Sequence, residues 1–565
     1  MLDGGTSQEQ FERRSLEAIG ASLAHEEGLK GRGIVLGFAD YGFDLQHPGL
    51  RRADAPDCTR FRALWSQADG QVWHGSDLDA GLAEAYDPHA HYYGSTGRAA
   101  ADDGAHGTLM AGIAAASRFG GFVGVAPEAD LLGVHLDLPD HAWREHDAAG
   151  TPDWDTWHPA ASPRWTGWKS YADAPAIVDA IEFLSDEARG SGATALVINL
   201  SVGTWAGPHN GRSAVARAIS AAIARGEDGD GPPCAVVVGA GNAGADRGHV
   251  AGEIAAGGCS EIVWRFPEQA SRPDKLEVWL EAADGPPADL SCAITPASRA
   301  ERAGLPSFAV TATHTTDICL GDRRVGIADL TPAASGALTR IRISIDPRRA
   351  NEVLPAIHRG GSAWRIMLTR PTGAAPVQFH AWRERNDSPH ASTLDGNARS
   401  STLCDFACAA GAIVAGGYDP WQPETGADFA YASHGPAPWF STGAMAAPLI
   451  GAPAHGVFGP RSQSATTMPT SGTSPAAALV SGAVALIFEH AANRGRRLSQ
   501  ADLIGALTAG GGRPISDVAL GFGPLWLPRA LGLHDAERAA RPVSKHARPR
   551  SPITTTHAYQ REVLT

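Results

Sequence analysis

The chain has 565 residues, of which 43% are hydrophobic and 19% charged, and its formal net charge at pH 7 is −14. This length predicts roughly two to four domains with a large buried core. The acidic balance argues against a nucleic-acid partner and against an anionic membrane surface. We find no apolar run that predicts a signal peptide or a transmembrane helix.

Seven cysteines are scattered along the chain. Their odd number and irregular spacing do not indicate a disulfide framework, so we expect a reducing, cytoplasmic location. Cys404 and Cys408 lie four residues apart, but no second pair of ligands at metal-binding spacing follows them. We therefore interpret both thiols as buried apolar side chains and expect neither a metal ion nor another cofactor.

The first part of the chain alternates between two patterns. Gly-bounded apolar runs predict buried strands, and amphipathic or Gly-led runs predict helices. The expected strands cover residues 31–40, 129–136, 193–201 and 234–244, and the expected helices cover residues 104–118, 174–190 and 211–226. This alternation predicts an α/β fold with a parallel sheet and helices on both of its faces.

Between about residues 260 and 384 the pattern changes to eight short runs rich in β-branched and aromatic residues, without a convincing helix. Such runs, separated by turn residues, predict an all-β sandwich resembling a jelly roll. Its core should include Trp264, Trp279, Trp364 and Trp382, either inside the sandwich or where it meets its neighbour. After residue 405 the α/β pattern resumes, so the β domain is expected as an insert.

These changes of pattern give a domain division. We expect a leader at 1–24, the first part of the α/β domain at 25–258, the inserted β-sandwich at 259–403, the second part of the α/β domain at 404–538, and a disordered tail at 539–565.

The stretch "SGTSPAAALVSGAVALIFE" (471–489) is apolar on every side, which predicts a buried helix. Pro475 suits its first turn, and this places Ser474 at the N-cap or one residue before it. Capping alone would explain a serine there. The alternative is a nucleophile at the helix start, which would require a base, a group that orients the base, and an oxyanion donor elsewhere in the chain.

Three residues could supply those groups. Asp40 ends a buried strand, His106 opens a helix, and Asn242 follows an apolar run in "GAGNAG". Each alone has an ordinary interpretation, Asp40 and Asn242 as turn residues and His106 as a structural histidine. Together they fit one chemistry, in which His106 takes the proton of Ser474, Asp40 orients His106, and Asn242 stabilises the oxyanion.

Five motifs now define a resemblance. The segments "GIVLGFADYGFDLQHPGL", "DDGAHGTLMAGIAAA", "INLSVGTWAG", "VVVGAGNAG" and "SGTSPAAALVSGAVALI" resemble, in order, the core motifs of subtilisin-like serine proteases. The resemblance implies that Asp40, His106 and Ser474 form a catalytic triad and that Asn242 is the oxyanion residue. It also implies two groups of substrate-binding residues, Ser201, Val202 and Gly203 in a strand that pairs with the substrate, and Gly239, Ala240 and Gly241 in one wall of its pocket.

Finer features, including "RALWSQADG" (62–70), "GPHNGRS" (207–213) and the β insert, look like the Csp germination-protease group. That group includes members that have lost the triad, whereas this chain has all three residues. The expected function is therefore a serine endopeptidase acting on proteins or peptides. The alternatives are an inactive binding or regulatory protein with the same fold, and an exopeptidase of the tripeptidyl-peptidase type.

Overall fold

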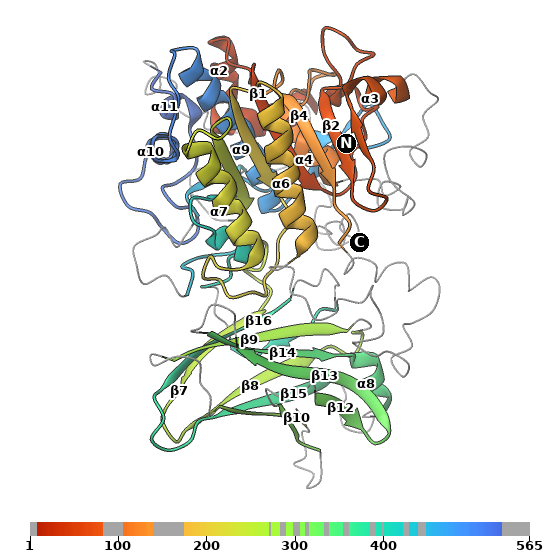
Figure 1. Cartoon of the computed structure of the whole chain (residues 1–565), viewed down its shortest axis with the longest axis vertical. Helices are drawn as coiled ribbons and strands as arrows, with labels where there is room; N and C mark the ends of the chain where they lie inside the picture. Colours follow the sequence, from red (N-terminus) through yellow and green to blue (C-terminus); the bar gives the residue numbers. More distant parts are fainter. Residues whose placement is uncertain are drawn as a thin grey trace.

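The computed structural model describes residues 8–82, 106–138, 174–270, 273–282, 290–297, 306–310, 316–332, 338–353, 361–384, 390–396, 400–421, 429–438 and 448–533. The tail expected at 539–565 lies outside these residues. Two parts follow one another along the long axis of the molecule (Figure 1). One is an α/β part, and the other, which we call the insert, consists almost entirely of strands.

The α/β part is built on an eight-stranded sheet with the strand order β19-β18-β6-β5-β1-β4-β2-β3. Neighbouring strands are parallel except β2 and β3. The strands are β1 (Ile34–Asp40), β2 (Phe61–Ser66), β3 (Val72–His74), β4 (Asp130–His135), β5 (Ala195–Leu200), β6 (Cys234–Gly239), β18 (Ile413–Tyr418) and β19 (Ile450–Pro453). The predicted parallel sheet is confirmed, and every residue of β1 is buried, as in a strand covered on both faces.

Helices cover both faces of this sheet (Figure 1). α4 and α9 pack with Leu36 and Phe38 of β1 on one face, and α6 and α7 pack with Val35 on the other. The helical elements of this part are α1 (Gln8–Ile19), α2 (Ala21–Glu26), η1 (Pro48–Leu50), α3 (Gly75–Leu82), α4 (His106–Ala115), α6 (Pro175–Gly190), α7 (Ala214–Glu227), η4 (Asp405–Cys408), α9 (Thr473–Ala492), α10 (Gln500–Gly511) and α11 (Leu527–Ala530). A hairpin of β20 (Val457–Pro460) and β21 (Thr467–Thr470) completes it.

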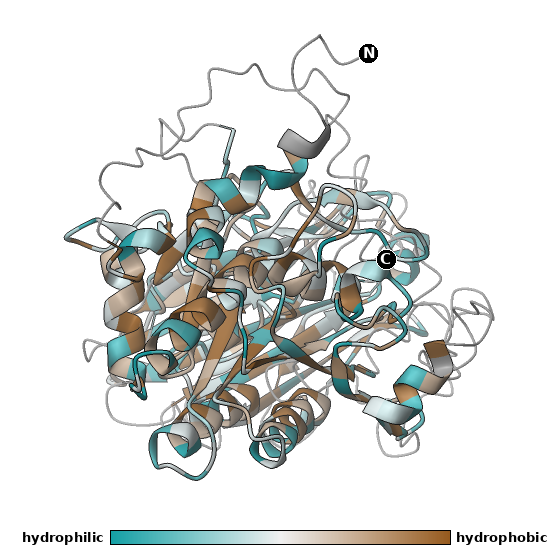
Figure 2. Ribbon diagram, turned by 90° about the horizontal axis from the view of Figure 1, so that it is seen from above, coloured by the Kyte–Doolittle hydropathy of each residue, from teal (hydrophilic) through white to brown (hydrophobic). Residues whose placement is uncertain are grey.

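Helix α9 is the central helix of the α/β part, and 17 of its 20 residues are buried. Its length and apolar composition would suit a helix that crosses a membrane. However, 89% of its most apolar 18-residue stretch is buried inside the protein. In Figure 2 the strands in the middle of the molecule are coloured mostly as hydrophobic residues. We therefore interpret α9 as the core helix predicted from the sequence.

The N-terminal segment packs against the same core. Leu16 and Ile19 of α1 belong to the apolar cluster that contains α9. The ring of Phe11 lies 5.4 Å from that of Trp421, and the Thr467 hydroxyl donates to Glu12 at 2.7 Å. The described part of the expected leader is thus attached to the α/β part by both apolar and polar contacts.

The insert is a sandwich of two antiparallel sheets with one apolar core. The five-stranded sheet has the order β11-β10-β15-β8-β17, and the six-stranded sheet has the order β12-β13-β14-β9-β16-β7. Its elements are β7 (His249–Ile254), β8 (Cys259–Phe266), β9 (Asp274–Ala282), β10 (Ser291–Ala297), β11 (Phe308–Val310), β12 (Thr316–Leu320), β13 (Arg323–Pro332), β14 (Leu338–Ile345), α8 (Pro347–Val353), β15 (Ser362–Thr369), β16 (Val377–Arg383) and β17 (Thr393–Leu394).

The four tryptophans of the insert are buried where the sequence places them. Trp264 and Trp364 face each other across β8 and β15 in the sandwich core. Trp279 and Trp382 form a separate cluster with Leu338. Trp382 also stacks on His209 of the α/β part, with ring centroids 4.0 Å apart, so it lies at the seam between the two parts.

The structure differs from the sequence prediction in two places. The insert contains a short helix, α8, where only strands were expected, because Asp346 accepts hydrogen bonds from the N–H groups of Arg348 and Arg349 and starts a helical turn. In addition, β7 precedes the boundary expected at residue 258 yet pairs with β16 of the insert. We therefore propose that the inserted unit begins at His249.

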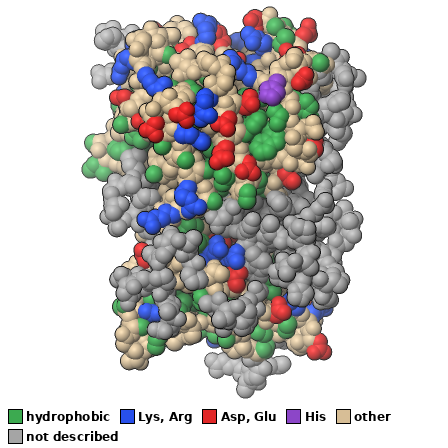
Figure 3. Space-filling view, viewed as in Figure 1, with side chains coloured by type: hydrophobic (Ala, Val, Ile, Leu, Met, Phe, Trp, Pro, Cys, Tyr) green, Lys and Arg blue, Asp and Glu red, His purple; other side chains and the backbone are tan. Residues whose placement is uncertain are grey.

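On the face of the α/β part seen in Figure 3, acidic and basic side chains are interspersed. The excess of negative charge therefore does not gather into a single acidic patch on that face.

Candidate active site

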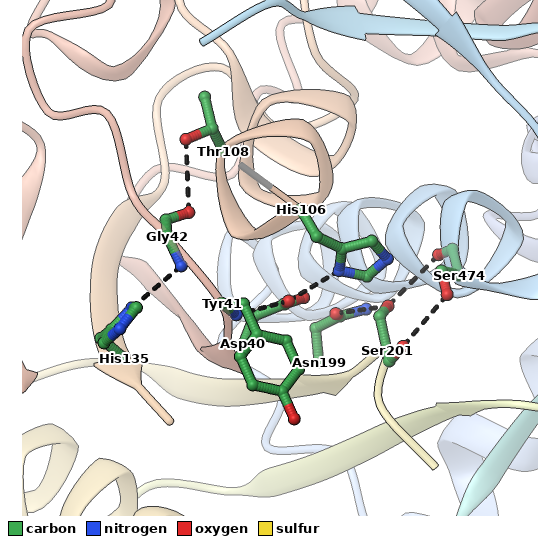
Figure 4. Close-up of polar contacts among 9 residues, drawn as sticks. All are labelled: Asp40, Tyr41, Gly42, His106, Thr108, His135, Asn199, Ser201 and Ser474. Carbon is green, nitrogen blue, oxygen red and sulfur yellow. Dashed lines mark hydrogen bonds and ion pairs between the residues drawn. The ribbon is translucent and has the colours of Figure 1, made fainter. Parts of the chain in front are cut away.

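The four side chains expected to carry the chemistry lie at strand ends and helix starts. Asp40 is the last residue of β1, His106 is the first residue of α4, and Ser474 is the second residue of α9. Asn242 follows the end of β6 by three residues. In Figure 4 the imidazole of His106 lies between Asp40 and Ser474. Open α/β sheets place their sites at these carboxyl ends of the strands.

Asp40 and His106 form a short hydrogen bond in the interior. Nδ1 of His106 lies 2.6 Å from Oδ1 of Asp40, and the same oxygen accepts the N–H of Tyr41 at 2.7 Å. Asp40 is fully buried and His106 nearly so. Because an ionised carboxylate can only accept, Nδ1 of His106 carries the proton of this bond. Nε2 is then the basic nitrogen, on the side of the ring that faces Ser474 (Figure 4).

The helix that carries His106 is tied to the loop after Asp40. The N–H of Gly107 donates to the carbonyl oxygen of Tyr41 at 2.7 Å, and the N–H of Thr108 donates to that of Gly42 at 3.0 Å. These bonds satisfy N–H groups that a helix start leaves without a partner. A side chain at 107 would place its Cβ 2.8 Å from the Gly42 oxygen, so glycine is required there.

His135 supports this loop from the neighbouring strand. It pairs with Asp40 in the β1–β4 register, and its Nδ1 accepts the N–H of Gly42 at 2.9 Å (Figure 4). Burial lowers the pKa of His135 to about 4, so the ring is neutral near pH 7. Nothing in the sequence singled out this residue, because one histidine in an apolar strand has no local signature.

Ser474 lies inside the first turn of α9. The sequence prediction of an N-cap position is wrong, because Gly472, with φ of 138°, occupies the N-cap and the helix begins at Thr473. Pro475 still falls in the first turn, as predicted. The hydroxyl of Ser474 donates to the carbonyl oxygen of Ser201 at 3.0 Å, so its proton points to the end of β5.

Thr473 holds the side chain of Asn242. Its N–H donates to Oδ1 of Asn242 at 2.9 Å, and its hydroxyl donates to the same oxygen at 3.2 Å. Because both groups are donors here, the atom that they contact must be the amide oxygen. Within the described part of the chain, neither Nδ2 of Asn242 nor the N–H of Ser474 donates to a protein acceptor. These two donors are therefore available to a ligand.

The two expected substrate-binding segments flank the start of α9. Ser201 contacts Ser474 directly, and the Cβ that a side chain at Gly239 would add lies 3.0 Å from Oγ1 of Thr473. The N–H of Gly241 also donates to that oxygen at 3.0 Å. The described residues thus bring the strand end and the loop after β6 to the same helix start as the four side chains above.

Both expected substrate-binding segments pack against the stretch of chain that follows the insert. The N–H of Cys404 donates to the carbonyl oxygen of Ala240 at 2.7 Å. A Cβ on Gly203 would lie 2.4 Å from Sγ of Cys404, and Val202 is largely buried. Buried Cys404 thus serves as a packing residue here, and burial raises its pKa to about 12. Cys408 is buried as well.

Comparison with known proteins decides the family. The profile of the subtilase family, Peptidase_S8, matches residues 31–523. The chain belongs to the subtilase family. Subtilases are serine peptidases, which agrees with the resemblance read from the five motifs. Comparison with curated proteins gave no significant match.

Solved structures add information on the fold. The CspB protease of Clostridium perfringens is similar over 95% of this chain and 99% of its own, with a TM-score of 0.67 and 21% identity. The serine protease MycP1 of a type VII secretion system covers 92% of this subtilase and 88% of its own chain, with a TM-score of 0.42 and 16% identity. The first similarity shows a shared fold along nearly the whole of both chains.

One polar network of this subtilase was not predicted from the sequence. The hydroxyl of Ser201 donates to Oδ1 of Asn199 at 2.8 Å, and Nδ2 of Asn199 donates to the hydroxyl of Ser481 at 3.0 Å. The Ser201 hydroxyl also lies 3.3 Å from the carbonyl oxygen of Ser474. These bonds fix the end of β5 to two places on α9 that lie about two turns apart. Figure 4 shows the part of the network formed by Asn199, Ser201 and Ser474. A polar residue within the apolar run "ALVINL" was the only available hint.

Proposed function

We propose that this subtilase is an active serine endopeptidase with Asp40, His106 and Ser474 as its triad. The observation that carries the proposal is the 2.6 Å bond between buried Asp40 and His106, with Ser474 on the opposite side of the ring. Such a pair fixes the tautomer of the base and stabilises the imidazolium that forms when it takes a proton.

The steps follow from these positions. Oγ of Ser474 attacks the carbonyl carbon of the peptide bond while Nε2 of His106 takes the hydroxyl proton. The oxyanion forms between Nδ2 of Asn242 and the N–H of Ser474, the two available donors. His106 then gives its proton to the leaving amine as the C–N bond breaks. Water, deprotonated by His106, hydrolyses the acyl-enzyme and restores Ser474.

The substrate is proposed to be an extended protein or peptide segment. Its backbone would lie beside residues 201–203, and its side chain before the cleaved bond would lie against residues 239–241. A segment following a strand end can add the substrate as a further strand, through main-chain hydrogen bonds. The similarity in fold to CspB supports the Csp branch, and seven unpaired cysteines support a cytoplasmic location.

One observation favours an inactive relative as the second candidate. The Ser474 hydroxyl donates to the Ser201 carbonyl oxygen rather than to His106. For catalysis that proton would have to be directed to Nε2 of His106 instead. If this arrangement persists in solution, the protein would bind peptides without cleaving them.

A fluorophosphonate probe tests the proposal. The wild-type protein should be labelled at Ser474 and should cleave peptides blocked at both ends, which an exopeptidase would not accept. Ser474→Ala should remain folded and lose turnover by several orders of magnitude; knocking out the nucleophile of subtilisin costs about 10⁶-fold. Near-normal cleavage by Ser474→Ala would overturn the assignment, and an unlabelled, inert wild-type protein would favour the second candidate.

A further inference from the structure

The insert returns to the α/β part through two buried charged residues. Arg383 ends β16, and Glu384 follows it. Only 1% of Arg383 and 5% of Glu384 is exposed. Charged side chains are rarely buried to this degree unless they are paired, because an unpaired charge is costly to remove from water. The groups that Arg383 and Glu384 contact should therefore show why these two side chains are buried.

Glu384 binds the segment that follows the proposed substrate strand. Its two carboxylate oxygens lie 2.6 and 2.8 Å from the hydroxyl of Thr204, which is fully buried. The backbone of Thr204 is held as well, because its carbonyl oxygen accepts the N–H of Asp405 at 3.0 Å. Thr204 directly follows residues 201–203, so the insert fixes the chain one residue beyond the proposed substrate contacts.

Arg383 contacts the loops that follow the two proposed substrate-binding segments. Its guanidinium lies over the ring of Trp205, 5.1 Å from the centroid. Its Nη2 lies 3.4 Å from Oδ2 of Asp246, four residues after the proposed oxyanion residue Asn242. The N–H of Arg383 also donates to the carbonyl oxygen of Gly248 at 2.8 Å. One side chain therefore joins the loop after β5 to the loop after β6.

The seam around this pair is packed tightly. Trp382, the preceding residue, stacks on His209 and donates its Nε1–H to the carbonyl oxygen of Ser401 at 2.8 Å. Asp405 accepts the N–H of His209 at 2.8 Å. Since the rings and backbone groups on both sides are held, a displacement of β16 would be transmitted to residues 204 and 205 rather than absorbed by loose packing.

We propose that Arg383 and Glu384 are positioning residues through which the insert sets this subtilase's preference for extended peptides. The proposal rests on the proposed function and deepens it. Pairing with several substrate residues requires an ordered edge at 201–203, whereas a single-residue ester needs only the nucleophile, the base and the oxyanion donors. The Glu384–Thr204 bond orders that edge, and Arg383 sets its distance from the Asn242 loop.

The test compares two substrates in purified full-length variants. Glu384→Gln weakens the charge-assisted bond, and Thr204→Val removes the hydroxyl while Thr204→Ser retains it. For Glu384→Gln and Thr204→Val, kcat/KM on a blocked tetrapeptide should fall about tenfold, mainly through KM, and that on a single-residue ester should fall less than about twofold. Thr204→Ser should restore the tetrapeptide value. Rates are expressed per fluorophosphonate-titrated site, so partial unfolding does not alter the ratio of the two substrates.

The matched control is Asp329→Asn in the insert. Asp329 is similarly buried and binds Arg342 at 2.8 and 3.1 Å, and the variant removes one carboxylate charge from the insert without touching the seam. It should leave the substrate ratio unchanged.

Hydrogen exchange of residues 201–206 supplies a readout that needs no activity. It should accelerate about tenfold in Glu384→Gln and Thr204→Val but not in Asp329→Asn. Unchanged exchange together with an unchanged substrate ratio in both seam variants would overturn the positioning role. If the wild-type protein neither labels nor cleaves, the proposed function fails, and accelerated exchange would still identify the contact as the element that orders residues 201–206.

Discussion

The backbone N–H of Thr473 donates to Oδ1 of Asn242 at 2.9 Å. The residue before the proposed nucleophile therefore fixes the orientation of the proposed oxyanion donor. Since the hydroxyl of Thr473 also accepts the N–H of Gly241, the loop after β6 and the start of α9 are held together by one side chain. The proposed nucleophile, the proposed oxyanion donor and the proposed pocket wall are thus coupled within a few residues.

Asn242→Ala should lower kcat on the order of 100-fold and leave KM little changed. The lost amide N–H would act mainly on the oxyanion, which exists only in the transition state, and removing one such donor in subtilisin costs about 3 kcal/mol. Steady-state kinetics on a blocked peptide measure both constants. A large rise in KM at constant kcat would instead make Asn242 a residue that binds the substrate in its ground state.

Thr473→Val should lower kcat about tenfold, because it removes the hydroxyl that contacts both Gly241 and Asn242 but keeps the N–H bond to Asn242. Thr473→Ser, which keeps the hydroxyl, should restore most of kcat. The melting temperature of each variant controls for a general loss of stability. Equal kcat in the valine and serine variants would show that the hydroxyl does not orient the oxyanion donor.

The sequence predicted the elements that have strong local patterns. The apolar runs that form β1, β5 and β6 are buried on both faces of the sheet. A short, continuous apolar run bounded by turn residues is typical of such a buried strand. The motifs also placed Asp40, His106 and Ser474 near one another. Their catalytic roles stay a prediction, as do the roles of the two substrate-binding segments.

The contacts that the sequence did not predict depend on distant parts of the chain. His135 contacts Gly42, which lies 93 residues away, and Glu384 contacts Thr204, which lies 180 residues away. Contacts between residues so far apart in the sequence produce no periodic pattern from which they could be predicted. The N-cap error at Ser474 has a local cause, since Gly472 adopts a backbone conformation that lets the helix begin two residues earlier than an N-cap at Ser474 would place it.

Acid should destabilise the protein through its buried histidines. Burial lowers the pKa of His209 and His249 to about 3, and that of His380 to about 4. In the unfolded chain these groups have a pKa of about 6.5, so between pH 6.5 and 4 the unfolded state binds more protons. The free energy of unfolding should therefore fall as the pH drops through this window, by up to about 1.4 kcal/mol per pH unit for each histidine.

Melting temperatures between pH 7.5 and 5 measure this effect. His249→Phe removes one titrating ring and keeps an aromatic side chain beside Trp382, so its melting temperature should depend less steeply on pH. His74→Gln, at an exposed position, is the matched control and should retain the slope of the wild-type protein. Identical slopes in all three proteins would exclude His249 as a source of the acid sensitivity.

Removal of the insert should cost stability and change substrate choice while sparing the triad. Because β7 pairs with β16, the excision must run from His249 to residue 399, joining Gly248 to Ser400 through a short linker. The shortened chain exposes His209 and leaves Thr204 without its carboxylate partner, so we expect a lower melting temperature and weaker cleavage of folded proteins. Labelling by the fluorophosphonate probe should persist, since Asp40, His106, Ser474 and Asn242 all lie outside the excised residues. A folded, stable product that no longer reacts with the probe would mean that the insert completes the active site itself.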